Sequence, residues 1–395
     1  MNHRSGAAFL AAVLVVVSKL AAASACYVAP AGVASGSCPS NAPCDLAYAI
    51  AQIASCEGTI LLNPGTYGEN VDITQDGSVR LIGLGSGVIL QGTGAGMCGV
   101  QVDSTGSAQV WLRNLEVLGT SLGTTPGSYS DICINASSGG VSMTLDHVVV
   151  TGAPGAGIEL FPGTDQLTIL DSAIVGNGTS SVTSIGGIYL HHGANLLIDR
   201  SLIAGNTNNY DPQGGGGLHI FNTGGYPATI TNTTFAGNQA KRAAAISMFS
   251  VTLTLNNVTL AADNTAIDGS IMNASSSVAI NHSIIAGACE SGSSAVAASS
   301  AGSIESPGDT CGLPAGGSNM VNVTLGQLLL GALANNGGPT QTMLPQAGSV
   351  AIGNGGTGCE LVDQRDFFRG GACDVGAAQA NATIVDEIYR GSFEF

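Results

Sequence analysis

A short alternation of apolar and polar residues recurs along the middle of the chain. An apolar residue occupies the same phase in seven copies, at steps of 33, 24, 29, 32, 25 and 25 residues: Leu112, Leu145, Ile169, Ile198, Ile230, Leu255 and Ile280. Irregular steps of this size predict the coils of a parallel β-helix with loops of variable length. Ankyrin and leucine-rich repeats fit less well, because their fixed helical signatures are absent.

Each copy of the repeat carries a polar residue two positions after this apolar residue. These residues are Asn114, His147, Asp171, Arg200, Asn232, Asn257 and His282. The residue that follows each of them is small or branched, so the alternation breaks here and predicts a tight bend between two strands. Asn tolerates the left-handed backbone that such a bend needs. We expect stacked coils to gather these side chains in one structural column, called the bend column below.

A second strand follows four of the copies, in segments 157–163, 187–193, 217–223 and 245–251. Alternation assigns two inward-facing columns: Ile158, Ile188, Leu218 and Ile246, then Leu160, Leu190, Ile220 and Met248. A single coil cannot bury these residues alone, so stacking must stabilise them.

The ends of such a solenoid need covering, since terminal coils expose strand edges. Residues 44–56 have helical spacing, with Leu46, Ile50 and Ile53 on one face, and precede a strand at 58–67. The loop-rich stretch at about 310–380 is expected to close the other end. The predicted fold is therefore all-β, a right-handed parallel β-helix solenoid with an N-terminal amphipathic cap helix. Its expected parts are a signal peptide (1–25), an N-terminal cap (26–67), β-helix coils (68–310), a C-terminal region (311–380) and a tail (381–395).

Composition agrees with this fold and excludes several partners. Only 9% of residues are charged, against about 25% in ordinary globular domains. The chain therefore has too few charged residues to form a surface of helices with charged outer faces. The net charge of −16 with only 10 Lys and Arg residues leaves no basic stripe for nucleic acid. The same sign disfavours docking on anionic lipid.

The N-terminus is typical of an export signal. Arg4 precedes an apolar run at 7–17, and the small residues Ala23-Ser24-Ala25 follow it. Cys26 raises the alternative of a lipoprotein, but a Leu three residues before it is missing. We expect simple cleavage and a secreted or cell-surface protein, because it leaves all ten cysteines for five pairs. The apolar run is too short to span a bilayer comfortably, and no later segment is a transmembrane candidate.

Paired cysteines require an oxidising compartment. Proximity in the sequence predicts the pairs Cys98–Cys133, Cys289–Cys311 and Cys359–Cys373. The remaining Cys26, Cys38, Cys44 and Cys56 pair among themselves in one of three ways, which the sequence leaves open. No CxxC motif occurs, so we expect no metal on these cysteines.

The C-terminal stretch carries a specific motif. NNGGPTQTMLPQAGSVAIGNGGTGC (335–359), followed by DQRDFFRGGACDVGAAQ (363–379), resembles the choice-of-anchor Q domain of bacterial secreted β-helix proteins. Asn354 and the pair Phe367-Phe368 depart from that pattern. The rest of the chain resembles the pectin-lyase-like superfamily in its style of repeat alone. The resemblance implies a secreted or surface-displayed β-helix and assigns no activity.

The sequence contains few candidates for catalytic residues. A lyase acting on uronic acids needs cations and a base, yet Arg80, Arg113, Arg200, Lys241 and Arg242 do not fall in one column. The pair Asp146-His147 is similar to the Asp-His of pectate lyases, but His147 occupies the bend position. A glycosidase needs two nearby carboxylates, and no strand presents a suitable outward pair. We therefore expect no catalytic residues and no cofactor.

One surface stands out for ligand binding. On the second strand, alternation predicts two outward columns: Glu159, Tyr189, His219 and Ser247, then Phe161, His191, Phe221 and Phe249. Only 5% of the chain is aromatic, so this concentration suits sugar rings. The alternative is structural stacking, or cover by the loop 206–217. A metal at His191, His192 and His219 is not expected, because no carboxylate or Cys completes the set.

The predicted function is adhesion or glycan binding by a secreted or cell-surface monomer, with a polysaccharide or host-surface glycan as partner. One alternative is a polysaccharide lyase or glycoside hydrolase with an unrecognised site. The other is a purely structural surface passenger.

Overall fold

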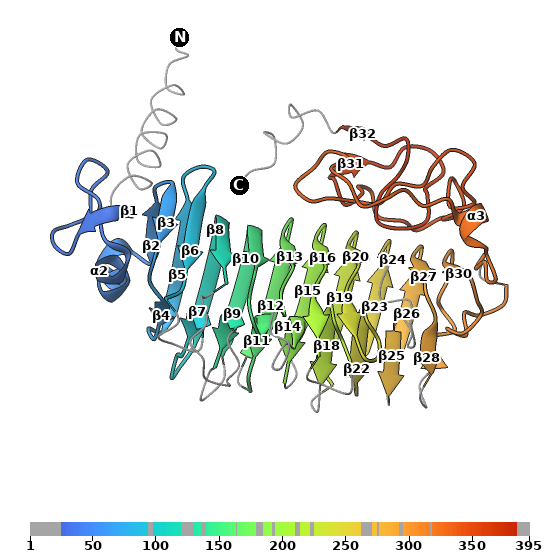
Figure 1. Ribbon diagram of the computed structural model, residues 1–395, viewed down its shortest axis with the longest axis horizontal. Helices are drawn as coiled ribbons and strands as arrows, with labels where there is room; N and C mark the ends of the chain where they lie inside the picture. The colour runs from blue at the N-terminus through green and yellow to red at the C-terminus, as the bar shows by residue number, and fades with distance from the viewer. Residues whose placement is uncertain are drawn as a thin grey trace, which may run out of the picture.

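The computed structural model describes residues 25–93, 98–119, 130–135, 140–162, 164–178, 185–191, 194–209, 214–221, 225–261, 271–274, 276–291, 295–316 and 318–384. The expected signal peptide lies outside these residues, as do the last eleven residues of the tail. The described chain forms a parallel β-solenoid whose coils stack along one axis (Figure 1). None of the described helices is long and apolar enough to cross a membrane.

The larger sheet contains two rows of parallel strands, one on each side of the bend. The row before the bend is β1 (Cys26–Val33), β2 (Thr59–Leu62), β5 (Gly77–Gly83), β8 (Ala108–Leu118), β10 (Val141–Thr151), β12 (Thr164–Leu170), β15 (Asn195–Asp199), β19 (Pro227–Thr231), β23 (Thr252–Asn256), β26 (Ser277–Asn281) and β29 (Ala295–Val296). The row after the bend is β3 (Gly65–Tyr67), β6 (Val88–Gln91), the second halves of β8 and β10, β13 (Ala173–Val175), β16 (Leu202–Ala204), β20 (Thr234–Ala236), β24 (Thr259–Ala261), β27 (Ile284–Ala286) and β30 (Ile304–Ser306).

The second sheet has nine parallel strands, and it runs along the lower side of the solenoid in Figure 1. They are β4 (Val71–Ile73), β7 (Cys98–Val102), β9 (Ser130–Ile134), β11 (Ala156–Leu160), β14 (Gly186–Leu190), β18 (Leu218–Phe221), β22 (Ile246–Phe249), β25 (Ile271–Ala274) and β28 (Cys289–Ser291). Two small pairs complete the strands: β17 (Thr207–Asn208) with β21 (Gln239–Ala240), and β31 (Phe367–Phe368) with β32 (Thr383–Ile384).

The expected bend is confirmed at every copy of the repeat. All seven residues of the bend column have φ between +44° and +56°, which is the left-handed region. A single left-handed residue interrupts the pleat and turns the chain from the first row of strands into the second. The polar side chains at these bends therefore stack on one flank of the solenoid.

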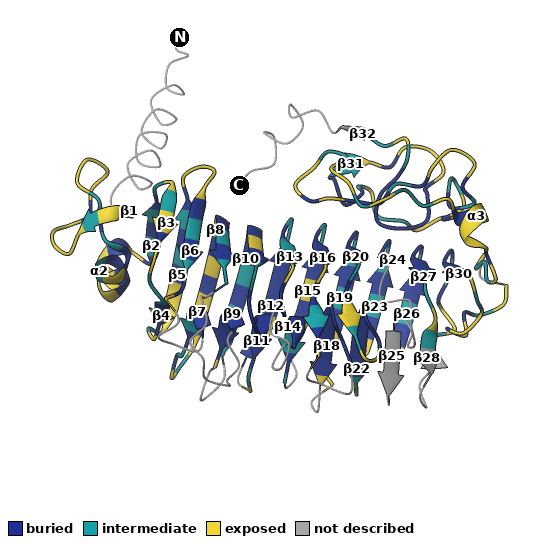
Figure 2. Ribbon diagram, viewed as in Figure 1, coloured by how far each residue is buried: buried dark blue, intermediate teal, exposed yellow. Residues whose placement is uncertain are grey.

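The interior is filled by the columns that alternation assigned to it. Their eight side chains are at most 1% exposed: Ile158, Leu160, Ile188, Leu190, Leu218, Ile220, Ile246 and Met248. Figure 2 shows the same continuous burial along the coils. Because each coil covers its neighbour, the apolar surface is removed from water only when the coils stack.

A buried asparagine ladder supports another turn of the coils. The side chain of Asn206 accepts from the backbone N–H of Asn177 and donates to Oδ1 of Asn238 at 3.0 Å each. Gly157 leaves room for this ladder, since a Cβ there would lie 2.7 Å from Nδ2 of Asn177. The amides thus satisfy backbone groups that no strand partner reaches.

A short helical segment lies at the N-terminal end of the solenoid. It consists of α2 (Leu46–Ala51) and a 3₁₀ turn (Ile53–Cys56). Asp45 caps α2 by accepting from the N–H of Tyr48 at 2.6 Å. The four N-terminal cysteines form the disulfides Cys26–Cys56 and Cys38–Cys44, one of the three arrangements that the sequence left open.

The C-terminal region first covers the last coil and then turns back. Cys311 and Leu313 pack on the main core, and the N–H of Glu305 in β30 donates to the Met320 carbonyl at 2.8 Å, so this part lies over the far end of the solenoid. After α3 (Leu325–Leu328), the chain returns along the upper flank of the later coils (Figure 1). The physical reason is an apolar strip on the outer face of the row after the bend, formed by Leu202, Ala204, Ala236 and Ala261, which Met343 covers.

Candidate ligand-binding surfaces

The structure brings the predicted aromatic residues together as a ladder on the second sheet. Phe161 stacks on His191 with ring centroids 4.7 Å apart and planes at 10°. Tyr189 stacks on His219 at 4.6 Å and 9°. Phe249 is tilted against Phe221 at 5.9 Å. The ring faces therefore meet one another along the axis, a geometry that stabilises the stack and leaves mainly ring edges for a ligand.

Three of the four residues in the first predicted outward column are buried, so the expectation that they are open to a ligand is wrong, whereas Tyr189 of the same column is partly exposed. Glu159 and His219 are each 1% exposed, and Ser247 is fully buried. Glu159 accepts from Ser130 Oγ and lies 2.7 Å from Nε2 of His191, so a carboxylate does lie beside this histidine. The chain at Gly214 covers His219, whose Nδ1 lies 3.2 Å from the Gly214 carbonyl oxygen.

The side chains of the second aromatic column remain partly exposed to solvent. Phe221 is 37% exposed, and 32% of the His191 side chain is exposed. Phe161 and Phe249 are half-buried, whereas His192 lies outside the described residues. A rim of rings thus faces solvent at one ring per coil.

A charged ladder lies on the opposite flank, at the bend column. Asp146 comes immediately before a bend and His147 forms it, and the two side chains meet with Oδ1 and Nδ1 2.6 Å apart. Arg113, one coil earlier, places Nε 3.3 Å from Oδ2 of Asp146. One coil later, Asp171 receives two hydrogen bonds from Arg200, at 2.8 and 2.7 Å. Stacking in register is what aligns these groups.

These contacts shift the pKa values of the ladder. Burial alone would raise the pKa of Asp146, but the His147 hydrogen bond and the charge of Arg113 outweigh it and lower that pKa. The hydrogen bond to Asp146 raises the pKa of His147. The hydrogen bond to Asp171 likewise raises the pKa of Arg200. For Asp199, by contrast, burial outweighs the charge of Arg200 and raises the pKa of its carboxyl group.

The carboxylates and imidazole of this ladder form a metal-sized cluster. One ligand atom each from Asp146, His147 and Asp171 lies within 4.8 Å of the others. Guanidinium groups of Arg113 and Arg200 already contact both carboxylates. A cation would have to displace these ion pairs, so the donor set fits a metal poorly.

Two hollows flank the ladder over the row of strands after the bend. One, of about 340 Å³, is lined by Asn114, Glu116, His147 and Val149, together with the 85–88 turn. The other, of about 470 Å³, lies between the strands β13 and β16 and the C-terminal region at Pro339–Gln341. The floor of the second hollow is apolar, with polar groups at Thr340 and Gln341.

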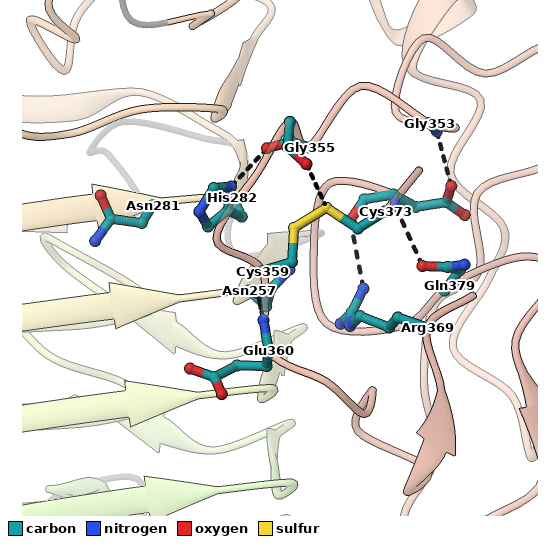
Figure 3. The surroundings of a disulfide bond; sticks show 12 residues. Asn257, Asn281, His282, Gly353, Gly355, Cys359, Glu360, Arg369, Cys373 and Gln379 are labelled. Carbon is teal, nitrogen blue, oxygen red and sulfur yellow. Dashed lines mark hydrogen bonds between the residues drawn. A yellow bond between two sulfur atoms is a disulfide. The ribbon is translucent and has the colours of Figure 1, made fainter. Parts of the chain in front are cut away.

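The C-terminal region covers the rest of the bend column. Asn232, Asn257 and His282 are at most 8% exposed, while His147 and Asn114 are exposed. Oδ1 of Asn257 accepts from the N–H of Glu360, and Nδ1 of His282 donates to the Gly355 carbonyl at 2.6 Å (Figure 3). The charged ladder is thus the solvent-exposed part of the bend column, and the C-terminal region covers the other part.

The motif of the C-terminal region builds a polar core that holds it in this position. Arg365 forms two hydrogen bonds with Asp363, and its guanidinium lies 4.6 Å from the centre of the Phe367 ring. Arg369 is buried and donates to the Gly376 and Ala377 carbonyls and to Oδ1 of Asn232. Burial lowers the pKa of Arg369 to about 10.

Three further disulfides join the cysteines that are neighbours in sequence. They are Cys98–Cys133, Cys289–Cys311 and Cys359–Cys373, and the described residues contain no free cysteine. The last one ties together two loop segments of the C-terminal region beside His282 (Figure 3). Five disulfides accord with a protein of an oxidising, extracellular environment.

Comparison with known proteins supports the fold alone. No family model matches the chain, and no curated protein matches it. The choice-of-anchor Q resemblance thus has no family match behind it. Pectate lyase Pel9A shares the fold. Its crystal structure superposes with a TM-score of 0.52 and 17% sequence identity, over 90% of this chain and 96% of that one.

The charged ladder was missed in the sequence because its members were judged one at a time. Arg113 and Arg200 lie in adjacent columns, one before a bend and one at a bend, rather than in a single column. Asp146 and Asp171 likewise come from different strand positions. Aligning both the bend residue and its predecessor across copies would have shown opposite charges on neighbouring coils.

Proposed function

We propose that this chain is an exported β-helix protein that binds a polysaccharide without cleaving it. The observation that carries the proposal is the open charged ladder, bounded by two hollows and by the C-terminal region. The pectate-lyase-like fold supports a polysaccharide as ligand by analogy alone. The likeness of residues 335–379 to choice-of-anchor Q domains supports export in the same way.

The geometry suits an extended chain of sugars that lies along the solenoid axis. Coils repeat at about 4.8 Å, so successive sugars meet equivalent positions of successive coils. Charged groups form the stronger hydrogen bonds with hydroxyl groups. The half-exposed Val149 and the apolar floor at Ala173 and Val175 suit the apolar faces of sugar rings.

The ion pairs of the ladder favour binding over hydrolysis. A glycosidase needs one carboxyl group that still holds its proton beside one that is ionised. The pKa of Asp146 is lowered, so this group is not suited to act as the acid. Burial raises the pKa of Asp199, but Nη1 of Arg200 donates to this carboxyl group and occupies it.

The aromatic rim of Phe161, His191, Phe221 and Phe249 is the second surface proposed for a glycan. Its partial exposure and its one ring per coil favour it. Its mutual stacking makes it the weaker of the two surfaces. The two surfaces lie on different sides of the solenoid, so mutations can test each of them independently.

A glycan array with the mature protein tests the proposal. The flank variant Glu116→Ala/His147→Ala should lose binding, because both residues line the smaller hollow. The rim variant Phe221→Ala/Phe249→Ala and the control Leu325→Ala, which removes a 65% exposed side chain, should retain it.

Loss in the rim variant alone would move the site to the aromatic rim. Release of sugar products during incubation would overturn the non-catalytic assignment. Absence of binding to every glycan would overturn the proposed function and leave a structural passenger.

A further inference from the structure

Most charges of the open flank are paired. Asp146, Asp171 and Asp199 provide three carboxyl groups, and Arg113 and Arg200 provide two guanidinium groups, with His147 beside them. Each of these groups has an opposite partner in its own coil or in the next one. Glu116, on the wall of the smaller hollow, adds one carboxyl group outside these pairs. A ligand therefore meets mainly pairs of ions rather than a field of one sign.

Arg200 has little capacity left for an anionic ligand, because each of its three nitrogen atoms already donates to a carboxylate. Arg200 uses Nε and Nη2 on Asp171 and Nη1 on Asp199, and only 23% of its side chain is exposed. A polyanion would have to break these bonds, which would leave carboxylates buried and unpaired at high cost. The net charge of −16 adds long-range repulsion.

A cationic ligand is disfavoured on the flank by the same pairing. The carboxylates of Asp146 and Asp171 already accept from arginine and, at Asp146, from His147. Only 13% and 12% of these two side chains are exposed. An ammonium group would compete for buried oxygens while it lies beside two guanidinium groups.

The exposed atoms of the ladder are suited to hydroxyl groups. About half of the Arg113 side chain is exposed, at 47%, and so is that of His147, at 45%. Asn114 beside them presents an amide, which both donates and accepts. Hydroxyl groups also do both, so they can bridge such groups without adding charge.

We infer that the open flank selects an uncharged polysaccharide and rejects acidic and basic ones, because its ions neutralise one another in pairs. This inference rests on the proposed function and names the ligand class of that site. It predicts binding that depends little on ionic strength, since salt screens attraction between net charges rather than hydrogen bonds to hydroxyl groups.

Affinity electrophoresis of the mature protein in gels that contain one polysaccharide tests the inference. The probes are galactomannan and arabinoxylan as neutral chains, polygalacturonate as an acidic chain and chitosan as a basic chain, at low and high salt. We expect retardation by a neutral chain alone, with little change on adding salt. Salt-sensitive retardation by polygalacturonate or chitosan, with none by the neutral chains, overturns the inference and leaves polysaccharide binding intact.

A substitution that unbalances one pair provides the second readout. Asp171→Asn removes the bidentate partner of Arg200 and should give a gain of at least several-fold in retardation by polygalacturonate. Asp165→Asn, at an exposed position of β12, makes the same change in net charge and should give no such gain. Asp146→Asn, which frees Arg113, repeats the test independently if Asp171→Asn does not fold.

Equal behaviour of the ladder variants and the Asp165→Asn control would show that pairing does not set selectivity, and would overturn the inference. Retardation by none of the four polysaccharides would instead overturn the proposed function itself.

Discussion

The buried carboxyl group of Asp131 should make the stability of the solenoid depend on pH. Asp131 on β9 is fully buried, and neither of its oxygens has a hydrogen-bond partner among the described residues. Burial therefore raises its pKa well above the ordinary value. The Ala153 N–H opposes this shift weakly, and it already donates to Oδ1 of Asn177 at 3.1 Å.

The sign of the effect follows from proton binding. The folded chain holds the Asp131 proton to a higher pH than the unfolded chain, whose pKa is about 3.9. The contribution of Asp131 to stability is thus greatest at low pH and falls as the pH rises from that value through the folded pKa. The loss within this window is about 1.4 kcal/mol for each pH unit.

Asp131→Asn isolates this contribution, because an amide of the same shape cannot ionise. Near pH 4 both chains bury a neutral group without partners and should have similar stability. Above it, the variant should gain over the wild type by about 1.4 kcal/mol for each pH unit. The assay is guanidinium unfolding of both proteins from pH 4 to pH 8, compared as a difference so that other titrating groups cancel. A difference that does not change with pH, or a variant that is less stable at neutral pH, would refute the reasoning.

Three further predictions concern the ladder, the C-terminal region and the flank. Asn206→Ala should cost about 3 kcal/mol or more in unfolding free energy, since it leaves buried partners of the asparagine ladder unsatisfied; denaturant unfolding checks this. Arg369→Met should leave the coils folded but loosen the C-terminal region at Asn232, seen as faster hydrogen exchange in residues 355–379 with unchanged exchange in β11 and β14. The pKa of His147, measured by NMR, should lie above 6.5 and fall toward it in Asp146→Asn.

The sequence was sufficient to predict the coils, because the same pattern of apolar and polar residues recurs in each of them. The left-handed backbone at residues as different as Asn114 and Arg200 was readable from the break in alternation alone. The inward columns followed from period-two spacing, since a slip by one residue would expose the whole set. Proximity of cysteines in the sequence was also sufficient to predict three of the disulfides.

The path of residues 318–384 could not be read in the same way. This region has no repeat, and its contacts with the coils join residues more than a hundred positions apart, such as Asn257 with Glu360. Burial of Glu159 and His219 was left open for a related reason, because alternation tells which side of a strand a residue occupies and not what lies over that side. The loop 206–217, which was one of the alternatives, contains the Gly214 that covers His219.

The folded-back C-terminal region also protects the solenoid from association along its flank. Without this segment, the apolar strip at Leu202, Ala204, Ala236 and Ala261 would be open to water. An exposed apolar strip of this kind favours aggregation. The returning segment therefore acts as a cover that keeps neighbouring copies of the solenoid apart.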